Sequence, residues 1–245
     1  MSYHSSDDVF AGKKALMSPV PTQSIETGGA EKSGYPYWLK IGFWVCIVIA
    51  IAVVLRRLVA LVHPQQSGPP QMVGLDRVFA SHTGLTLAHI LPAMAFVLLT
   101  PVVLLRWSKA AWLEQVLFLL GVVVGITAYG MSAYAVGGWV ERSAVLFFNS
   151  LFLFSLLRAY WYLRHGALLQ ERRWLIRAIG ILLGIATTRP VMGVFFATSR
   201  LTHLEPRQFF GIAFWIGFSI NTIAVELWLR SKNHRTQSAQ SGIRP

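Results

Sequence analysis

Charged residues are scarce in this sequence. Asp, Glu, Lys and Arg make up 13% of the 245 residues, and 54% are hydrophobic, whereas a soluble domain has about 25% charged residues. The deficit comes from long apolar segments of the ~20 residues that a helix needs to cross a bilayer. This composition excludes an ordinary soluble domain and predicts an all-α, polytopic transmembrane bundle in a lipid bilayer.

Cysteine and the common catalytic motifs are also lacking. The single cysteine, Cys46, excludes an intramolecular disulfide, so the fold depends on helix packing. We find no Gly-rich phosphate loop, no Ser-His-Asp arrangement at a useful spacing and no zinc motif. The sequence therefore predicts neither an enzyme of the soluble type nor a metal site.

Positive charge is in excess, with a formal net charge of +12. A nucleic-acid-binding protein clusters Lys and Arg on one solvated face. Here these residues lie at the ends of apolar segments, where they orient the spans in a membrane. The charge therefore indicates membrane topology, and we expect no nucleic-acid partner.

Six apolar segments lie between two polar tails. Residues 1–36 are rich in Ser, Gly, Pro and Lys and predict a disordered tail, whereas residues 230–245 form a basic tail. No cleavable signal peptide is expected, so the first span serves as the insertion signal. The transmembrane domain, 37–229, contains predicted spans at 38–62, 85–105, 112–135, 144–163, 174–197 and 208–229.

An even number of spans places both tails on one side of the membrane. More Lys and Arg residues lie on that side than on the other, so the positive-inside rule predicts cytoplasmic termini in a bacterial inner membrane. The cations expected on the opposite side are Arg56, Arg57, Arg77, Arg142, Arg200 and Arg207.

Two predicted spans carry pairs of glycines four residues apart, Gly121/Gly125 and Gly180/Gly184. Glycines at this spacing let two helix backbones approach closely. The pattern predicts close helix contacts at these faces, either within one chain or in a helix-helix oligomer.

Four charged residues fall at similar depth in the cytoplasmic half of four predicted spans. They are Glu114, Arg158, Arg177 and Glu226. A charge in hydrocarbon costs ~2.5–3.5 kcal/mol on insertion scales and calls for a partner. Two acids and two bases therefore predict structural ion pairs that clamp the bundle. A proton relay would need further carboxylates.

Arg189 lies near the membrane midplane, where no predicted span places an Asp or Glu. Its expected protein partners are His89, Tyr129, Asn149, Ser150 and the backbone carbonyls that the adjacent Pro190 leaves without a hydrogen bond. Five guanidinium donors exceed what these groups accept, so a haem propionate, a quinone oxygen or a lipid phosphate is a candidate to complete the set. We therefore treat Arg189, His89, Tyr129 and Asn149 as a candidate ligand site, with an arginine satisfied by the protein alone as the alternative.

His89 is the histidine that falls inside a predicted span. Bis-histidine haem ligation needs two imidazoles at matching depth on facing helices, and His203 in an outer loop is the candidate mate. His82, His89 and His203 lack a nearby carboxylate for a metal site. Haem and quinone stay open as cofactors, and no metal is predicted.

A spaced motif links the last charged turn to the membrane arginine. The residues of this motif are Gly166, Glu171, Trp174, Leu175, Arg177 and Arg189, and three further steps are His89-Ile90, Thr100-Pro101 and Gly137-Gly138. In these residues the chain resembles a bacterial membrane-protein family known as domain of unknown function 2306. The pattern of that family is a Gly followed five positions later by H-x-x-W-M-x-R and, twelve residues on, a second Arg.

The resemblance covers roughly residues 85–197, with two departures. Glu171 replaces the histidine of the motif, and a His-Arg step expected near residues 112–115 is absent. If those histidines hold a cofactor or metal in relatives, the resemblance implies that this chain has lost that site. It implies no particular activity.

Three functions remain in view. The first is an accessory, non-catalytic membrane protein that binds a lipid or small hydrophobic ligand near Arg189. The second is an electron-transfer protein that holds haem or quinone in the outer half of the bundle. The third, a small-solute transporter, would predict internal repeats, and the two halves show no convincing repeat.

The predicted topology has a direct test. A reporter that is active only in the periplasm, fused after Pro245, is expected to be inactive, because the positive-inside rule places that terminus in the cytoplasm. An active fusion would overturn the orientation.

Overall fold

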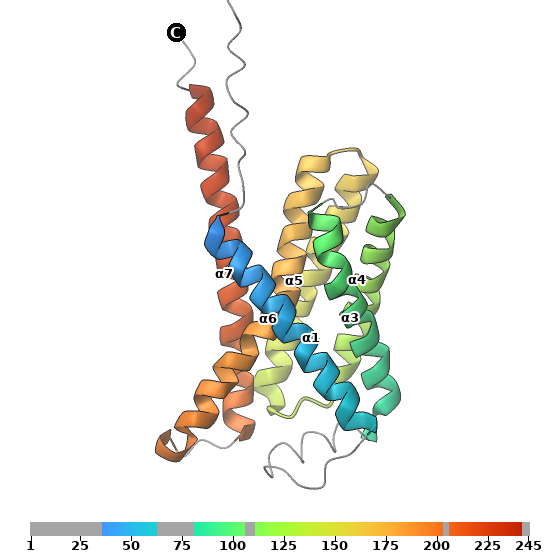
Figure 1. Ribbon diagram of the computed structural model, residues 1–245, viewed down its shortest axis with the longest axis vertical. Helices are drawn as coiled ribbons and strands as arrows, with labels where there is room; N and C mark the ends of the chain where they lie inside the picture. Colours follow the sequence, from blue (N-terminus) through green and yellow to red (C-terminus); the bar gives the residue numbers. More distant parts are fainter. Residues whose placement is uncertain (1–35, 63–80, 106–110, 203–205, 242–245) are drawn as a thin grey trace, which may run out of the picture. The chain divides into compact units, whose positions relative to one another are not determined.

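The fold consists of helices in every part of the chain that the structure describes, which is residues 36–62, 81–105, 111–202 and 206–241 of a computed structural model. The helices are α1 (Tyr37–Val62), α3 (Thr83–Leu104), α4 (Ala111–Ser132), α5 (Gly138–Arg164), α6 (Leu168–Thr202) and α7 (Pro206–Ser241) (Figure 1). Each contains a segment long and apolar enough to cross a membrane. The predicted all-α class and the six spans are confirmed, while the sidedness of the termini stays a prediction.

Several helices extend beyond their predicted limits. α5 begins at Gly138 rather than near residue 144, and α6 begins at Leu168 rather than at Trp174. α7 continues as helix past Leu229. The predicted tail at 1–36, apart from its last residue, and His203 lie outside the described residues.

Two glycines with positive φ end the short connections around α5. Gly138 has a φ of 63° and Gly166 a φ of 72°, values that residues with a Cβ rarely adopt. They let the chain turn back directly from α4 into α5 and from α5 into α6. Because the turn ends at Gly138, α5 begins there, and Glu141 lies in the first turn of this membrane-spanning helix.

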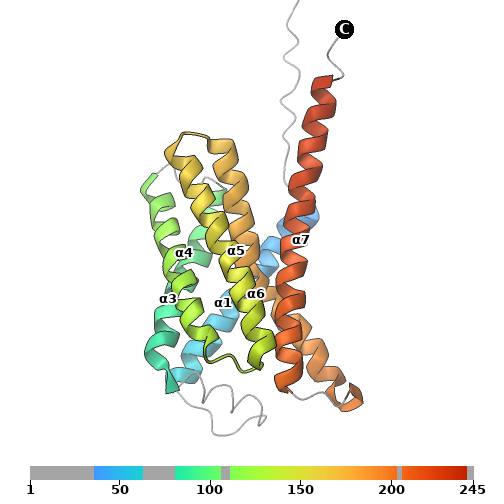
Figure 2. The same cartoon turned by 180° about the vertical axis from the view of Figure 1, so that it is seen from behind.

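α6 is the helix with neighbours on most sides. It packs against α7, α5 and α1, and touches α3 more lightly, while α3, α4 and α5 pack in chain order. α1 runs diagonally across α3 and α6 in Figure 1, and in the opposite view of Figure 2 it lies behind them. Side chains from α1 and α3 to α7 form one continuous apolar core, with Phe96, Leu117 and Phe209 fully buried.

The two glycine pairs pack against different helices of the same chain. A Cβ at Gly121 or Gly125 would overlap Leu156 or Leu153 of α5, and one at Gly180 or Gly184 would overlap Val225 or Phe218 of α7. The pairs therefore do not face each other. An oligomer through these faces would have to replace contacts that the chain already makes, and it stays a prediction.

The close α6–α7 contact predicts that the loss of stability caused by a Gly→Ala substitution depends strongly on its position. A Cβ at Gly217 of α7 would lie 2.7 Å from the backbone nitrogen of Thr188, whereas one at Gly193 of α6 meets nothing within 4 Å. We expect Gly217→Ala to lower stability by about 1–3 kcal/mol, because the backbones must separate. Gly193→Ala is the matched control and is expected to be neutral or slightly stabilising. Thermal unfolding in mild detergent measures both, and equal melting temperatures would contradict the close contact.

Candidate functional site

A cavity of about 280 Å³ lies among the helices, and each of the six described helices contributes to its wall. Most of the lining is apolar. The phenylalanines in it come from α5 and α7 and are Phe148, Phe152, Phe210, Phe214 and Phe218. Its charged, imidazole, phenol and amide side chains are Arg57, His82, His89, Tyr134, Glu141, Asn149 and Arg189. A small set of polar groups in an otherwise apolar pocket is the usual composition of a ligand site.

Arg189 enters this cavity from α6 with its hydrogen-bonding capacity largely unused. Its Nε is buried and has no hydrogen-bond partner in the described part of the chain. Its Nη1 contacts the Sδ of Met192, one turn further along α6, at 3.9 Å. A thioether sulfur is a weak acceptor. The guanidinium therefore lacks an oxygen acceptor among the residues that the structure describes.

The side chains expected to satisfy Arg189 are engaged elsewhere. Asn149 Nδ2 donates to the Gly125 carbonyl at 2.8 Å, and His89 Nδ1 lies 2.9 Å from Thr127 Oγ1. His89, Asn149 and Arg189 nevertheless line the same cavity. Tyr129 does not: its hydroxyl lies 2.7 Å from Ser150 Oγ, outside the cavity lining.

Sequence reasoning missed two charged residues of the cavity, Glu141 and Arg57. Both line it together with Arg189 and lie within electrostatic range of the guanidinium. Glu141 Oε2 accepts a hydrogen bond from the backbone N–H of Gly137 rather than from an arginine. The sequence predicts no acid at the depth of Arg189, because the predicted span at 144–163 leaves residue 141 outside it. The Gly137-Gly138 pair just before it is the signal of the tight turn that places it in the span.

The histidines of the cavity come from one end of one helix. His82 lies at the N-cap of α3 and its ring stacks on Tyr134, with ring centroids 3.7 Å apart, while His89 lies two turns further along α3. This placement is not that of two imidazoles on facing helices. Across residues 36–62, 81–105, 111–202 and 206–241, no three His, Cys, Asp or Glu residues are grouped to hold a metal ion.

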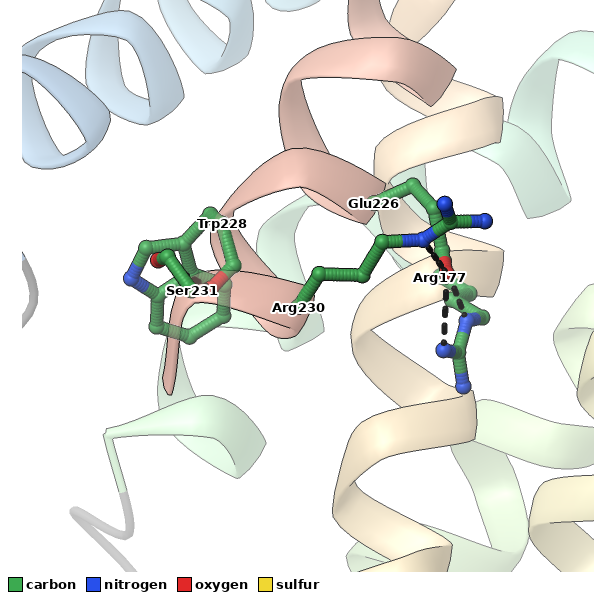
Figure 3. Close-up of polar contacts among 5 residues, drawn as sticks. All are labelled: Arg177, Glu226, Trp228, Arg230 and Ser231. Atoms are coloured by element: carbon green, nitrogen blue, oxygen red, sulfur yellow. Dashed lines mark hydrogen bonds and ion pairs between the residues drawn. The ribbon is translucent and has the colours of Figure 1, made fainter. Parts of the chain in front are cut away.

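The four inner charges do not form one mutual set of ion pairs. Arg177 Nε of α6 lies 2.9 Å from Glu226 Oε2 of α7, and Arg230 Nε lies 3.2 Å from the other oxygen of the same carboxylate. Figure 3 shows both arginines converging on Glu226, while Trp228 and Ser231 point away from them. Within the described ranges, Glu114 takes part in no ion pair. Of the four residues, the structure thus joins Arg177 and Glu226.

Arg158 is surrounded by aromatic rings instead of a carboxylate. Its guanidinium lies 5.0–5.6 Å from the ring centroids of Trp161, Tyr162 and Trp174, and its Nη2 donates to the Tyr162 hydroxyl at 2.9 Å. Ring faces attract a cation when it is removed from water. In the described residues, Arg158 thus faces aromatic rings, and its expected pairing with an acid stays a prediction.

Six apolar helices that share one core define a polytopic helical membrane protein. The chain belongs to the family described as "Predicted membrane protein (DUF2306)", which matches residues 86–229. No curated protein and no solved structure matches this chain. The match contains His89, Glu141, Asn149 and Arg189 and leaves α1 outside. The predicted resemblance is confirmed and extends further toward the C-terminus than residue 197.

The ion pair between Arg177 and Glu226 predicts that the stability losses on substituting these two residues are coupled. We expect Glu226→Gln and Arg177→Gln each to destabilise the protein in detergent and the double variant to lose less than their sum, by roughly 0.5–1 kcal/mol. The coupling is modest because the two side chains are 26% and 34% exposed. Glu226→Gln with Arg158→Gln is the control and should be additive, since Arg158 contacts rings. Additivity in the first pair would contradict the ion pair.

Proposed function

We propose that this chain is a non-catalytic, multi-pass membrane protein that binds a small apolar ligand through an anionic or carbonyl oxygen at Arg189. The observation that carries the proposal is the buried Nε of Arg189, which has no acceptor among the described residues and belongs to the lining of a cavity. The ligand oxygen would supply that acceptor.

The free energy of an unsatisfied buried donor supports this proposal. Leaving a buried polar group without a hydrogen bond costs about 1–3 kcal/mol, and more when the group is charged. Glu141 lies within range to offset part of the charge, but its Oε2 is hydrogen-bonded to Gly137. An incoming carboxylate or carbonyl oxygen would gain charge-assisted hydrogen bonds that are roughly twice as strong as neutral ones.

The shape of the cavity favours a compact ligand over a haem. A volume of about 280 Å³ lies just below the ~300–1,000 Å³ typical of small-molecule sites. His82 and His89 lie at the same end of α3, so neither faces the other across the cavity. A quinone head group fits the requirement for a carbonyl oxygen. We place the protein in a bacterial inner membrane with cytoplasmic termini on the charge distribution of its loops.

The proposal is tested by removing the guanidinium. Purified wild type is expected to carry a small organic molecule that solvent extraction and mass spectrometry detect, and Arg189→Leu is expected to lose it. Arg142→Leu is the matched control: Arg142 is exposed, outside the cavity lining, and contacts Trp139. Circular dichroism and size-exclusion chromatography verify that both variants fold. Equal ligand content in a folded Arg189→Leu protein would contradict the proposal.

A further inference from the structure

His89 has a defined tautomer because of the threonine beside it. Thr127 Oγ1 lies 2.7 Å from the Val123 carbonyl oxygen and 3.1 Å from that of Val124. Two oxygens at 2.7 Å require a hydrogen between them, and Thr127 has one hydroxyl hydrogen to give. The hydroxyl therefore accepts, rather than donates, in its 2.9 Å contact with His89 Nδ1. The hydrogen of the neutral imidazole is on Nδ1.

The other ring nitrogen of His89, Nε2, is consequently a hydrogen-bond acceptor. A second proton would place another cation in the apolar cavity that already holds Arg189, and an extra charge there costs free energy. The protein partners of the His89 ring are Thr127 and the Val124 carbonyl, which itself lies 3.1 Å from Thr127 Oγ1. Both are therefore on the Nδ1 side of the ring, and Nε2 is left for the cavity that His89 lines. The cavity thus contains an acceptor at His89 as well as a donor at Arg189.

The aromatic side chains of the cavity wall favour a planar ligand. The rings of Phe148 and Phe218 are stacked with centroids 5.2 Å apart and an interplanar angle of 17°, and Phe214 contacts Phe218 at 6.0 Å. All three line the cavity. Aromatic rings pack on one another in offset-stacked or edge-to-face arrangements that contribute about 0.5–1.5 kcal/mol beyond area burial. A single aromatic ring suits a cavity of this volume.

We propose that the ligand is a small phenolic compound that also carries a carboxylate or carbonyl oxygen. Its O–H donates to His89 Nε2, and its second oxygen accepts from Arg189. This inference rests on the proposed function and adds to it a requirement for a hydrogen-bond donor. A fatty acid ionised at neutral pH, by contrast, offers acceptors only and would leave Nε2 unsatisfied.

The test compares ligands that differ in the donor alone. The probes are 3- and 4-hydroxybenzoate and the corresponding fluorobenzoates, in which a fluorine of similar size replaces the hydroxyl group. Binding is measured by calorimetry on the full chain in detergent, after detergent exchange. At least one hydroxy isomer is expected to bind about tenfold more tightly than its fluoro analogue, the effect of about one hydrogen bond.

Substitution of His89 connects that preference to the assigned acceptor. In His89→Phe, the hydroxy probe is expected to bind about tenfold more weakly, at the level of its fluoro analogue, so that the preference for the hydroxyl falls to about one. His165→Phe is the matched control, because His165 is exposed, bonds the Trp161 carbonyl and lies outside the cavity lining. A preference that persists in His89→Phe would overturn the role of His89.

The remaining outcomes separate this inference from the function on which it rests. Equal binding of hydroxy and fluoro probes that is lost in Arg189→Leu would overturn the phenolic ligand and leave the proposed function standing. Binding that does not depend on Arg189, or no binding of any probe, would count against both.

Discussion

Within the hydrocarbon of a bilayer, no water is present to satisfy polar groups, so each must find its partner inside the protein. The described spans follow this rule in detail. Thr187 of α6 donates to Asn221 Oδ1 of α7 at 2.8 Å, Asn221 Nδ2 donates to the Gly180 carbonyl at 3.3 Å, and Cys46 of α1 approaches Thr187 at 3.7 Å. These contacts join three helices. A buried Nε without a hydrogen-bond partner occurs at both Arg158 and Arg189. Arg158 is surrounded by ring faces, whereas Arg189 lines the cavity.

The orientation of Arg189 follows from how α6 packs. Gly180, Gly184 and Thr188 recur every four residues and meet α7, where Thr188 lies against Gly217. The next residue on a helix points about 100° further round the axis, so Ile181, Ile185 and Arg189 form the adjacent face and line the cavity. The close α6–α7 contact therefore determines which face of α6 the cavity receives. A shift in that contact would rotate the guanidinium away from His89.

The sequence predicted which segments cross the membrane and how deep each residue lies, but not which way each side chain points around its helix. Apolar length predicted the six spans, and depth predicted that Arg189, His89 and Asn149 lie in one region. Depth does not specify direction around the helix axis, which is why Arg158 was expected to meet an acid and instead meets aromatic rings. Glu141 was missed for a different reason: the predicted span begins at residue 144, whereas α5 begins at the glycine turn and includes Glu141.

The cavity is lined by the region that matches the family, by α1, and by His82 and Leu85 just before the match. The region that matches the family, 86–229, supplies His89, Glu141, Asn149, Arg189 and the aromatic wall. α1 lies outside that match, packs against α6 and α3, and covers the cavity with Ala50, Val53, Val54 and Arg57. The groups proposed to recognise a ligand thus belong to the shared region, whereas α1 adds one apolar wall and one further arginine. Because α1 contacts two helices rather than the whole bundle, its contacts with α6 and α3 govern how fully that wall encloses the cavity.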